Sequence, residues 1–217
     1  MTSTSTSAAS ALRGELLKSA AAMGIVLDDS AARRLLVLLD ELERWNKTYN
    51  LTAITARHDM LTHHLLDSLA VSTLLGGERV IDVGTGAGFP GLPLAIIDPQ
   101  RRYTLLDSNG KKVRFVAHAA RTLGLTNVEP LHARAELHVP EKPYDTVIAR
   151  AFAPLPELVE QVAGLCGSAT RVLAMKGKRS ADERAGLPGN WRVEGDHDLE
   201  IPGLDEERHV IILRRSA

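Results

Sequence analysis

The chain has 217 residues, of which 44% are hydrophobic and 24% are charged, and its formal net charge is −1. This length allows one sizeable α/β domain with a small appendage. The near-zero charge excludes a molecule that attracts nucleic acid over its whole surface, so any phosphate-binding surface has to be local. The single cysteine, Cys166, excludes an internal disulfide and indicates a reducing compartment.

The N-terminal stretch MTSTSTSAAS contains Ser, Thr and Ala, without a basic start followed by an apolar core. We therefore expect a disordered tail over residues 1–11 and not a secretion signal. No apolar run approaches the roughly 20 residues that span a bilayer, so we expect a cytoplasmic protein with no membrane partner. The eight histidines lack the Cys/His spacing of a zinc site, so we expect no metal.

Residues 12–78 are predicted to form a helical segment. One apolar stripe at three-to-four-residue spacing predicts a helix that ends near Tyr49 or Asn50; it consists of Leu35, Leu38, Leu39, Leu42 and Trp45. The polar stretch that follows predicts a loop, which could close over a ligand or touch RNA. The alternative is a structural role, in which Trp45 anchors this segment in the core. A further helix is expected from His58 to Leu75, in which the i, i+4 pair His63 and Asp67 indicates a helix-stabilising contact.

Residues 79–217 alternate between strand and helix patterns. The strands are expected at RVIDVG, RYTLLDS, NVEPLHA, YDTVIARA and TRVLAMKG, with helices at GLPLAII, GKKVRFVAHAARTLGL and LPELVEQVAGLC. WRVEGDHDLEI and RHVIILRR resemble a final antiparallel pair. This alternation predicts a doubly wound, mostly parallel sheet of the Rossmann-like α/β class, preceded by an N-terminal helical cap and packed with it as one unit.

The loop after the first strand carries Gly84, Gly86 and Gly88, a spacing of G-x-G-x-G. A dinucleotide fingerprint needs a third glycine where this chain has Phe89, which argues against a nucleotide sensor that binds NAD. The loop resembles instead the first motif of the class I S-adenosylmethionine (AdoMet) methyltransferases, so we expect AdoMet as the cofactor. Asp82, just before the loop, either orients the amino acid part of AdoMet or caps the amides of the loop itself.

Two further positions are expected to complete the AdoMet site. Asp107 closes the second strand about twenty residues after the loop, where a carboxylate binds ribose hydroxyls, although it could instead cap the helix that follows. Ala135 and Glu136 follow the third strand, where an adenine pocket is expected.

The reaction is indicated by what the fourth strand lacks. It ends in IARAFAPL, without the Asp/Asn-Pro-Pro-aromatic box typical of enzymes that methylate exocyclic amines. Cys166 lies in a predicted apolar helix and is interpreted as a core residue, not a nucleophile. An acceptor that is already nucleophilic, such as guanine N7, needs only in-line positioning, with no covalent intermediate, metal or general base.

Several blocks together resemble one family: WNKTYNLT, HHLLDSL, IDVGTGAGFPGLPLAI, LLDSNGKKVRF, ARAFAPL, AMKG and ERHVIIL. They occur in the order found in the bacterial small-subunit rRNA guanine-N7 methyltransferases, the RsmG or glucose-inhibited division protein B family. The resemblance covers nearly everything from Leu35 to Arg214. It implies AdoMet-dependent methylation of one guanine N7 in 16S rRNA, either naked or within the small ribosomal subunit. Carried over by motif, the AdoMet contacts of the family fall on Gly84, Phe89, Ala135, Glu136 and Arg150.

Basic residues near the expected site are candidates for binding RNA. Arg150, at the end of the fourth strand, could hold the methionine carboxylate, an RNA phosphate or a structural ion partner. Lys176, Lys111, Lys112 and Arg114 could contact phosphates at the same edge of the sheet. A small-molecule AdoMet methyltransferase is an alternative reading, because fold alone does not determine the substrate.

Overall fold

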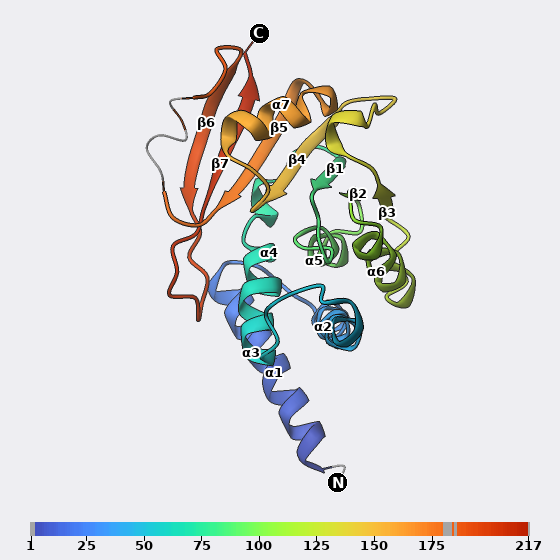
Figure 1. Cartoon of the computed structure of the whole chain (residues 1–217). Helices are drawn as coiled ribbons and strands as arrows, with labels where there is room; N and C mark the ends of the chain where they lie inside the picture. The colour runs from blue at the N-terminus through green and yellow to red at the C-terminus, as the bar shows by residue number, and fades with distance from the viewer. Residues whose placement is uncertain (1–2, 180–183, 185, 217) are drawn as a thin grey trace.

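The computed structural model describes residues 3–179, 184 and 186–216. Its centre is a seven-stranded sheet in the order β3-β2-β1-β4-β5-β7-β6 (Figure 1). The strands are β1 (Arg79–Val83), β2 (Arg102–Asp107), β3 (Val128–His132), β4 (Tyr144–Arg150), β5 (Cys166–Lys176), β6 (Trp191–Asp198) and β7 (His209–Arg215). Neighbours from β3 to β5 are parallel, and β7 is antiparallel to both β5 and β6. This confirms the predicted doubly wound, mostly parallel sheet.

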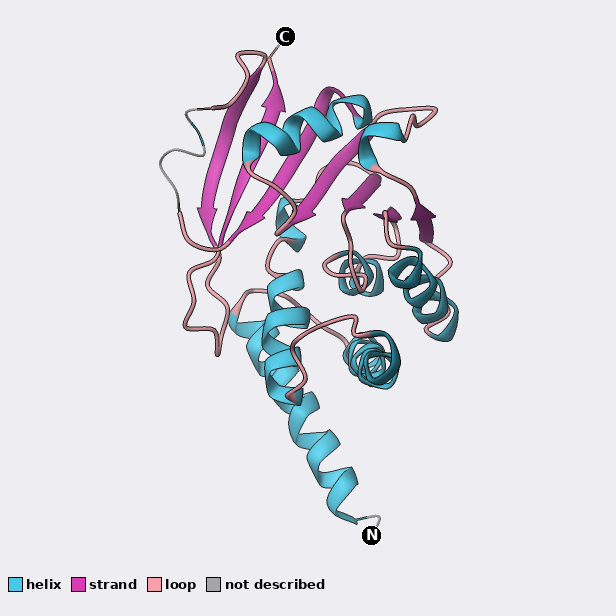
Figure 2. Ribbon diagram, in the orientation of Figure 1, coloured by secondary structure: helices cyan, strands magenta, loops and turns pink. Residues whose placement is uncertain are grey.

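Helices cover both faces of this sheet (Figure 2). They are α1 (Ser3–Ala22), α2 (Asp29–Tyr49), α3 (Arg57–Met60), the π-helical segment η1 (Leu61–Leu66), α4 (Asp67–Leu69), η2 (Ser72–Leu74), α5 (Gly91–Ile97), α6 (Gly110–Thr122), η3 (Ala135–Leu137), α7 (Leu155–Val162) and η4 (Ala163–Leu165). None of these described helices is long and apolar enough to cross a bilayer.

Alternation along the strands divides the core between the two faces. On one face Val80 and Ile148 belong to a cluster that includes buried residues of α1, α2, α5 and α6. On the other face Ile81 and Val147 pack with α7. The N-terminal helices therefore share one hydrophobic core with the sheet.

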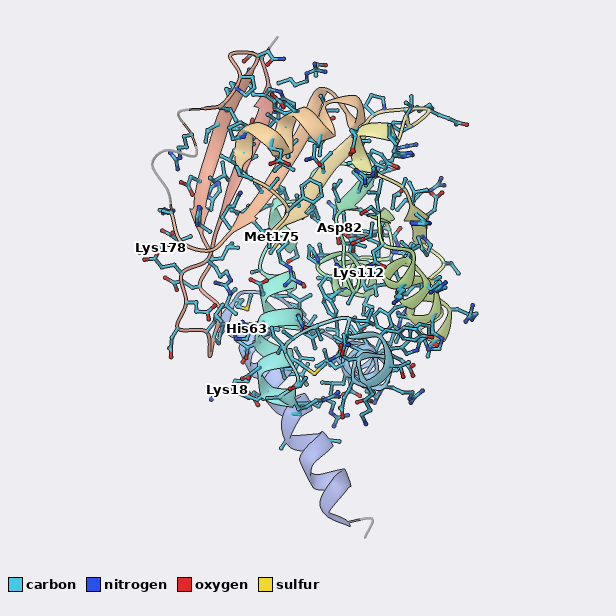
Figure 3. The ribbon with its side chains drawn as sticks, viewed as in Figure 1. Lys18, His63, Asp82, Lys112, Met175 and Lys178 are labelled. Carbon is cyan, nitrogen blue, oxygen red and sulfur yellow. The ribbon has the colours of Figure 1, made fainter. Side chains whose placement is uncertain are left out.

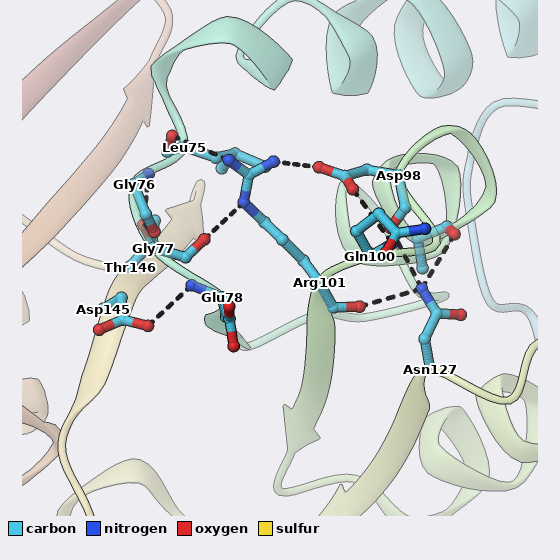
Figure 4. Close-up of polar contacts among 11 residues, drawn as sticks. Leu75, Gly76, Gly77, Glu78, Asp98, Gln100, Arg101, Asn127, Asp145 and Thr146 are labelled. Atoms are coloured by element: carbon cyan, nitrogen blue, oxygen red, sulfur yellow. Dashed lines mark hydrogen bonds and ion pairs between the residues drawn. The ribbon is translucent and has the colours of Figure 1, made fainter.

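The amino ends of the strands are held by a polar network (Figure 4). Arg101 pairs with Asp98, and its Nε donates to the Gly77 carbonyl at 2.7 Å. Asp145 accepts hydrogen bonds from the backbone amides of Glu78 and Arg79 at 2.9 and 2.8 Å. These bonds satisfy the backbone that leads into β1, so this edge of the sheet has a structural role.

Three expectations about local structure are corrected. Residues 1–11 were expected to form a disordered tail, but α1 begins at Ser3 and continues without a break to Ala22, with Leu16 buried in the core. The helix expected from His58 to Leu75 is interrupted by the π-helical segment η1, and its last α-helical residue is Leu69. Cys166 is buried as expected, but it begins β5 and does not lie in a helix.

Candidate active site

A cleft of about 500 Å³ lies at the carboxyl ends of β1, β4 and β5. In the strand order, β1 and β4 are adjacent while the chain leaves them in opposite directions, and ligands of doubly wound folds bind at such a switch point. Figure 3 labels Asp82 and Met175 at these strand ends, with His63 on the helical layer that faces them. The described residues that line the cleft are Leu51, Thr52, Ile54, His63, His64, Asp67, Gly84, Thr85, Gly86, Ala87, Phe89, Arg150, Ala151, Met175, Lys176, Gly177, Leu199, Arg208 and His209.

The three loop glycines have different roles. All have positive φ, of 69°, 61° and 84° for Gly84, Gly86 and Gly88. A Cβ at Gly84 would lie 2.5 Å from the ring of Phe152, and one at Gly88 would lie 2.3 Å from Leu92 Cδ1. At Gly86 the nearest atom would be 4.0 Å away. Packing therefore requires glycine at two positions, whereas the third presents bare backbone to the cleft.

Asp82 lies beneath the loop and does not line the cleft. Its Oδ2 accepts hydrogen bonds from Thr85 Oγ1 at 2.6 Å and from the Gly91 amide at 2.9 Å. Burial raises the pKa of Asp82 to about 6, against the lowering effect of these bonds. This geometry corresponds to the loop-capping interpretation of Asp82, in which the carboxylate holds the loop in shape.

Asp107 connects the second strand to the glycine loop. One carboxylate oxygen accepts from the Gly86 amide at 2.9 Å and the other accepts from the Asn109 amide at 2.8 Å. Lys112 Nζ lies 4.0 Å from the carboxylate. Ala135 is buried and Glu136 is exposed in η3, which follows β3. Since β3 lies two strands from β1, these two residues are beside the cleft and not in its wall.

Arg150 is both an ion-pair partner and a cleft residue. Its Nη1 donates to Asp67 Oδ2 at 2.8 Å and to the His63 carbonyl at 2.9 Å. Its guanidinium carbon lies 6.0 Å from the centre of the Phe89 ring. The structural and functional interpretations of Arg150 are therefore compatible, because the ion pair holds the guanidinium in the wall of the cleft.

Lys176 lines the same cleft, where its Nζ donates to the Ala153 carbonyl at 2.7 Å. Lys111, Lys112 and Arg114 begin α6, which follows the carboxyl end of β2, and they do not line the cleft. The structure thus separates the basic candidates into one lysine inside the cleft and a group beside it.

Five titratable cleft residues were not predicted as site residues: His63, His64, Asp67, Arg208 and His209. The blocks HHLLDSL and ERHVIIL contain them, but nothing local indicates that the two blocks meet. The interpretation that Asp67 contacts His63 on its own helix is wrong, because Asp67 pairs with Arg150 and Arg208 instead. The charged lining is three cations (Arg150, Lys176 and Arg208) and one carboxylate, a local positive charge in a nearly neutral chain.

His64 forms a floor of the cleft with Phe89. The two rings stack with centroids 4.8 Å apart, and His64 Nε2 lies 3.1 Å from Thr52 Oγ1. Burial, and next the charge of Arg150, lower the pKa of His64 to about 4. The imidazole is therefore neutral at physiological pH.

Comparisons with known proteins agree on one family. The sequence model of the family described as rRNA small subunit methyltransferase G matches residues 31–211. The chain is 46% identical over 203 residues to "Ribosomal RNA small subunit methyltransferase G" of Marinobacter nauticus, which covers 94% of this chain and 95% of that protein. For the protein of the same name from Escherichia coli O1:K1 / APEC, the identity is 45% over 199 residues, covering 92% and 95%.

Solved structures support the fold. A SAM dependent methyltransferase from Aquifex aeolicus gives a TM-score of 0.54 at 20% identity, covering 72% of this chain and 93% of that chain. TrmN from Thermus thermophilus gives a TM-score of 0.55 at 21% identity, covering 80% and 53%.

Proposed function

The chain belongs to the rRNA small subunit methyltransferase G family, and on this premise we propose that it transfers a methyl group from AdoMet to N7 of one guanine in 16S rRNA. The observation that carries the proposal is the cleft at the switch point of the sheet, where the backbone of Gly86 faces open space beside three cationic side chains. The proposed setting is the cytoplasm, with the rRNA as the macromolecular partner.

The residues in and beside the cleft support AdoMet as the methyl donor. Gly84 and Gly86 would lie under the methionine part, and Phe89 would pack at its edge. Asp107 is held at the end of β2, where a ribose would meet it, and Ala135 with Glu136 would bound the adenine. Bound AdoMet supplies an electrophilic methyl group on a sulfonium. The NAD alternative is disfavoured because Phe89 is buried where a dinucleotide fold needs a glycine.

The chain's contribution to the reaction is proposed to be positioning. Guanine N7 carries a lone pair in the ring plane and no proton, so no general base is required. His64 is neutral at pH 7 and therefore adds no further cation to the wall. Arg150, Lys176 and Arg208 would bind oxyanions of the reactants, and their charges would hold the RNA backbone so that the base enters the cleft. No metal or covalent step is proposed.

The group at the start of α6 is proposed as an extension of the RNA surface. Lys111 and Arg114 are exposed, and Lys112 is half-buried beside Asp107. They belong to the same carboxyl edge of the sheet as the cleft, so an RNA strand leaving the cleft over β2 would pass them. Phosphate contacts of this kind position a substrate without reading its sequence.

The test is labelled methyl transfer from AdoMet into rRNA of a strain that lacks this protein, with wild-type rRNA as the control. We expect incorporation into the unmethylated 16S rRNA alone, at one guanine, which chemical cleavage at N7-methylguanine would map. Parallel reactions with naked 16S rRNA and with small ribosomal subunits decide which form is the substrate. No incorporation at guanine N7 in either form would refute the proposal, and calorimetry with AdoMet and NAD would separate the two cofactors.

A further inference from the structure

Asp67 lies between two arginines that come from distant parts of the chain. It begins α4 in the N-terminal helical layer, Arg150 ends β4, and Arg208 directly precedes β7. The side chain of Asp67 is only 4% exposed, whereas those of Arg150 and Arg208 are 24% and 23% exposed. All three line the cleft. The carboxylate is thus buried behind two guanidinium groups that reach the open space.

Each carboxylate oxygen of Asp67 serves a different arginine. Oδ2 accepts from Arg150 Nη1 at 2.8 Å, and Oδ1 lies 3.4 Å from Arg208 Nε. The second contact is an ion pair without a hydrogen bond, since Oδ1 has no hydrogen-bond partner among the described residues. Arg208 is also held by the Glu207 carbonyl at 2.9 Å and by Glu206 at 2.6 Å. Asp67 is therefore the common partner of both arginines.

The physical need for such a residue follows from charge. Two guanidinium groups facing one cleft repel each other, and a buried carboxylate is itself costly unless it is paired. Placing one carboxylate between them reduces both costs, and within the cleft it leaves one net positive charge, since Glu206, the other carboxylate paired with Arg208, is exposed and does not line the cleft. Both groups can then stay in the wall of the cleft before any substrate arrives, so no reorganisation is needed when an anion binds.

We propose that Asp67 is a positioning residue that presents Arg150 and Arg208 together to one oxyanion of the reactants. This inference rests on the proposed function for the identity of that oxyanion, which is an RNA phosphate or the carboxylate of AdoMet. Asp67 itself touches neither reactant; it acts through the two arginines. The N-terminal helical layer thereby contributes to the active site and does more than cover the sheet.

Asp67→Asn tests the proposal because it keeps the shape of the side chain and removes its charge. The cleft then gains one unit of positive charge, so rRNA binding measured without AdoMet is expected to stay within threefold of wild type or to tighten. Turnover is expected to fall at least tenfold, because the arginines lose their common anchor. Asp98→Asn is the control variant, since Asp98 is likewise paired with an arginine, but it is half-buried and lies at the amino edge of the sheet (Figure 4).

A double-mutant cycle separates positioning from a general structural effect. In each of the Arg150→Gln and Arg208→Gln backgrounds, Asp67→Asn should reduce turnover less than it does in the wild-type protein, because one of the two groups it acts through is already gone. When both arginines are replaced, the further loss should be less than twofold. Calorimetry identifies the oxyanion: a tenfold rise in the Kd of AdoMet assigns the methionine carboxylate, and an unchanged Kd with lower turnover assigns an RNA phosphate. Asp98→Asn is expected to keep wild-type turnover, so equal melting temperatures of Asp67→Asn and Asp98→Asn would exclude unfolding as the cause of a loss seen only in Asp67→Asn.

The proposal is overturned if Asp67→Asn keeps turnover within twofold of wild type, or if its loss multiplies fully with that of each arginine variant. A crystal structure of Asp67→Asn tests the proposal without any substrate. The guanidinium groups of Arg150 and Arg208 should both be displaced from their wild-type positions. If both remain in place, the proposal is also overturned. Absence of methyl transfer by the wild-type protein would instead refute the proposed function, and the crystal structure would still decide the role of Asp67.

Discussion

Replacing Gly86 with valine tests the proposed AdoMet site most directly. Gly86 has a φ of +61° and lines the cleft, and an added Cβ would meet no atom of the protein closer than 4.0 Å. A residue with a side chain costs roughly 1–2 kcal/mol in the left-handed region. For a chain of this size each kcal/mol corresponds to about 2–4 °C in Tm, so we expect a fall of about 2–8 °C.

The effect on ligand binding should be much larger than the effect on folding. Three added carbon atoms would occupy space next to the loop backbone, so isothermal titration calorimetry should show at least a 100-fold rise in the Kd of AdoMet, about 2.8 kcal/mol. Circular dichroism melting measures the stability of the same sample. A folded Gly86→Val protein that binds AdoMet within threefold of wild type would show that the loop is not the donor site.

Gly88→Ala provides the contrasting control. Gly88 shares the left-handed conformation, with a φ of +84°, but its added Cβ would lie 2.3 Å from Leu92 Cδ1 and 2.7 Å from Leu92 Cγ. Overpacking of this kind typically adds about 1–3 kcal/mol to the backbone strain. We therefore expect Gly88→Ala to lower Tm more than Gly86→Ala does and to affect the AdoMet Kd less. The opposite order would contradict the division of roles between the glycines.

Three further predictions concern the charged groups. Asp107→Ala should weaken AdoMet binding by roughly 1–3 kcal/mol in calorimetry, because hydrogen bonds to the ribose are lost and the Gly86 amide loses its acceptor. An unchanged Kd would show that Asp107 is not part of the site. Arg150→Lys keeps the positive charge near Asp67 but loses the planar guanidinium fork, so turnover should fall at least tenfold while Tm changes by only a few degrees. A large fall in Tm that accompanies the loss of turnover would favour a purely structural ion pair. The pKa of Asp82 is raised to about 6, so the stability that Asp82 contributes is complete below about pH 4 and is lost as the pH rises to 6. The pKa of His64 is lowered to about 4, so the stability that His64 contributes is complete above pH 6.5 and is lost as the pH falls to 4. In urea unfolding between pH 4 and 6, Asp82→Asn should make the slope of stability against pH more positive by about 1.4 kcal/mol per unit and His64→Gln should make it less positive by a similar amount; parallel slopes would refute both assignments.

Much of the fold is predictable because its signals are local. Alternation of short apolar runs with amphipathic stretches predicts the strands in order, and β1, β2 and β4 lie where RVIDVG, RYTLLDS and YDTVIARA predict them. The glycine loop is predictable for a related reason, because three glycines within five residues indicate a backbone that needs glycine at these positions. The ends of elements are less certain: Cys166 continues an apolar run, yet it pairs with Tyr144 and begins a strand.

The sequence by itself therefore determined the sheet, the glycine loop and the acid at the end of β2, because each depends on residues close together in the chain. Only the tertiary structure decided which glycine faces the cleft, why Asp82 lies behind the loop, and that Asp67 joins Arg150 and Arg208. Asp67 and Arg150 are 83 positions apart, and they meet because the helical layer packs against the carboxyl edge of the sheet. The physical reason is that periodicity encodes which face of an element is buried, whereas the neighbours of a buried charge depend on how distant elements pack.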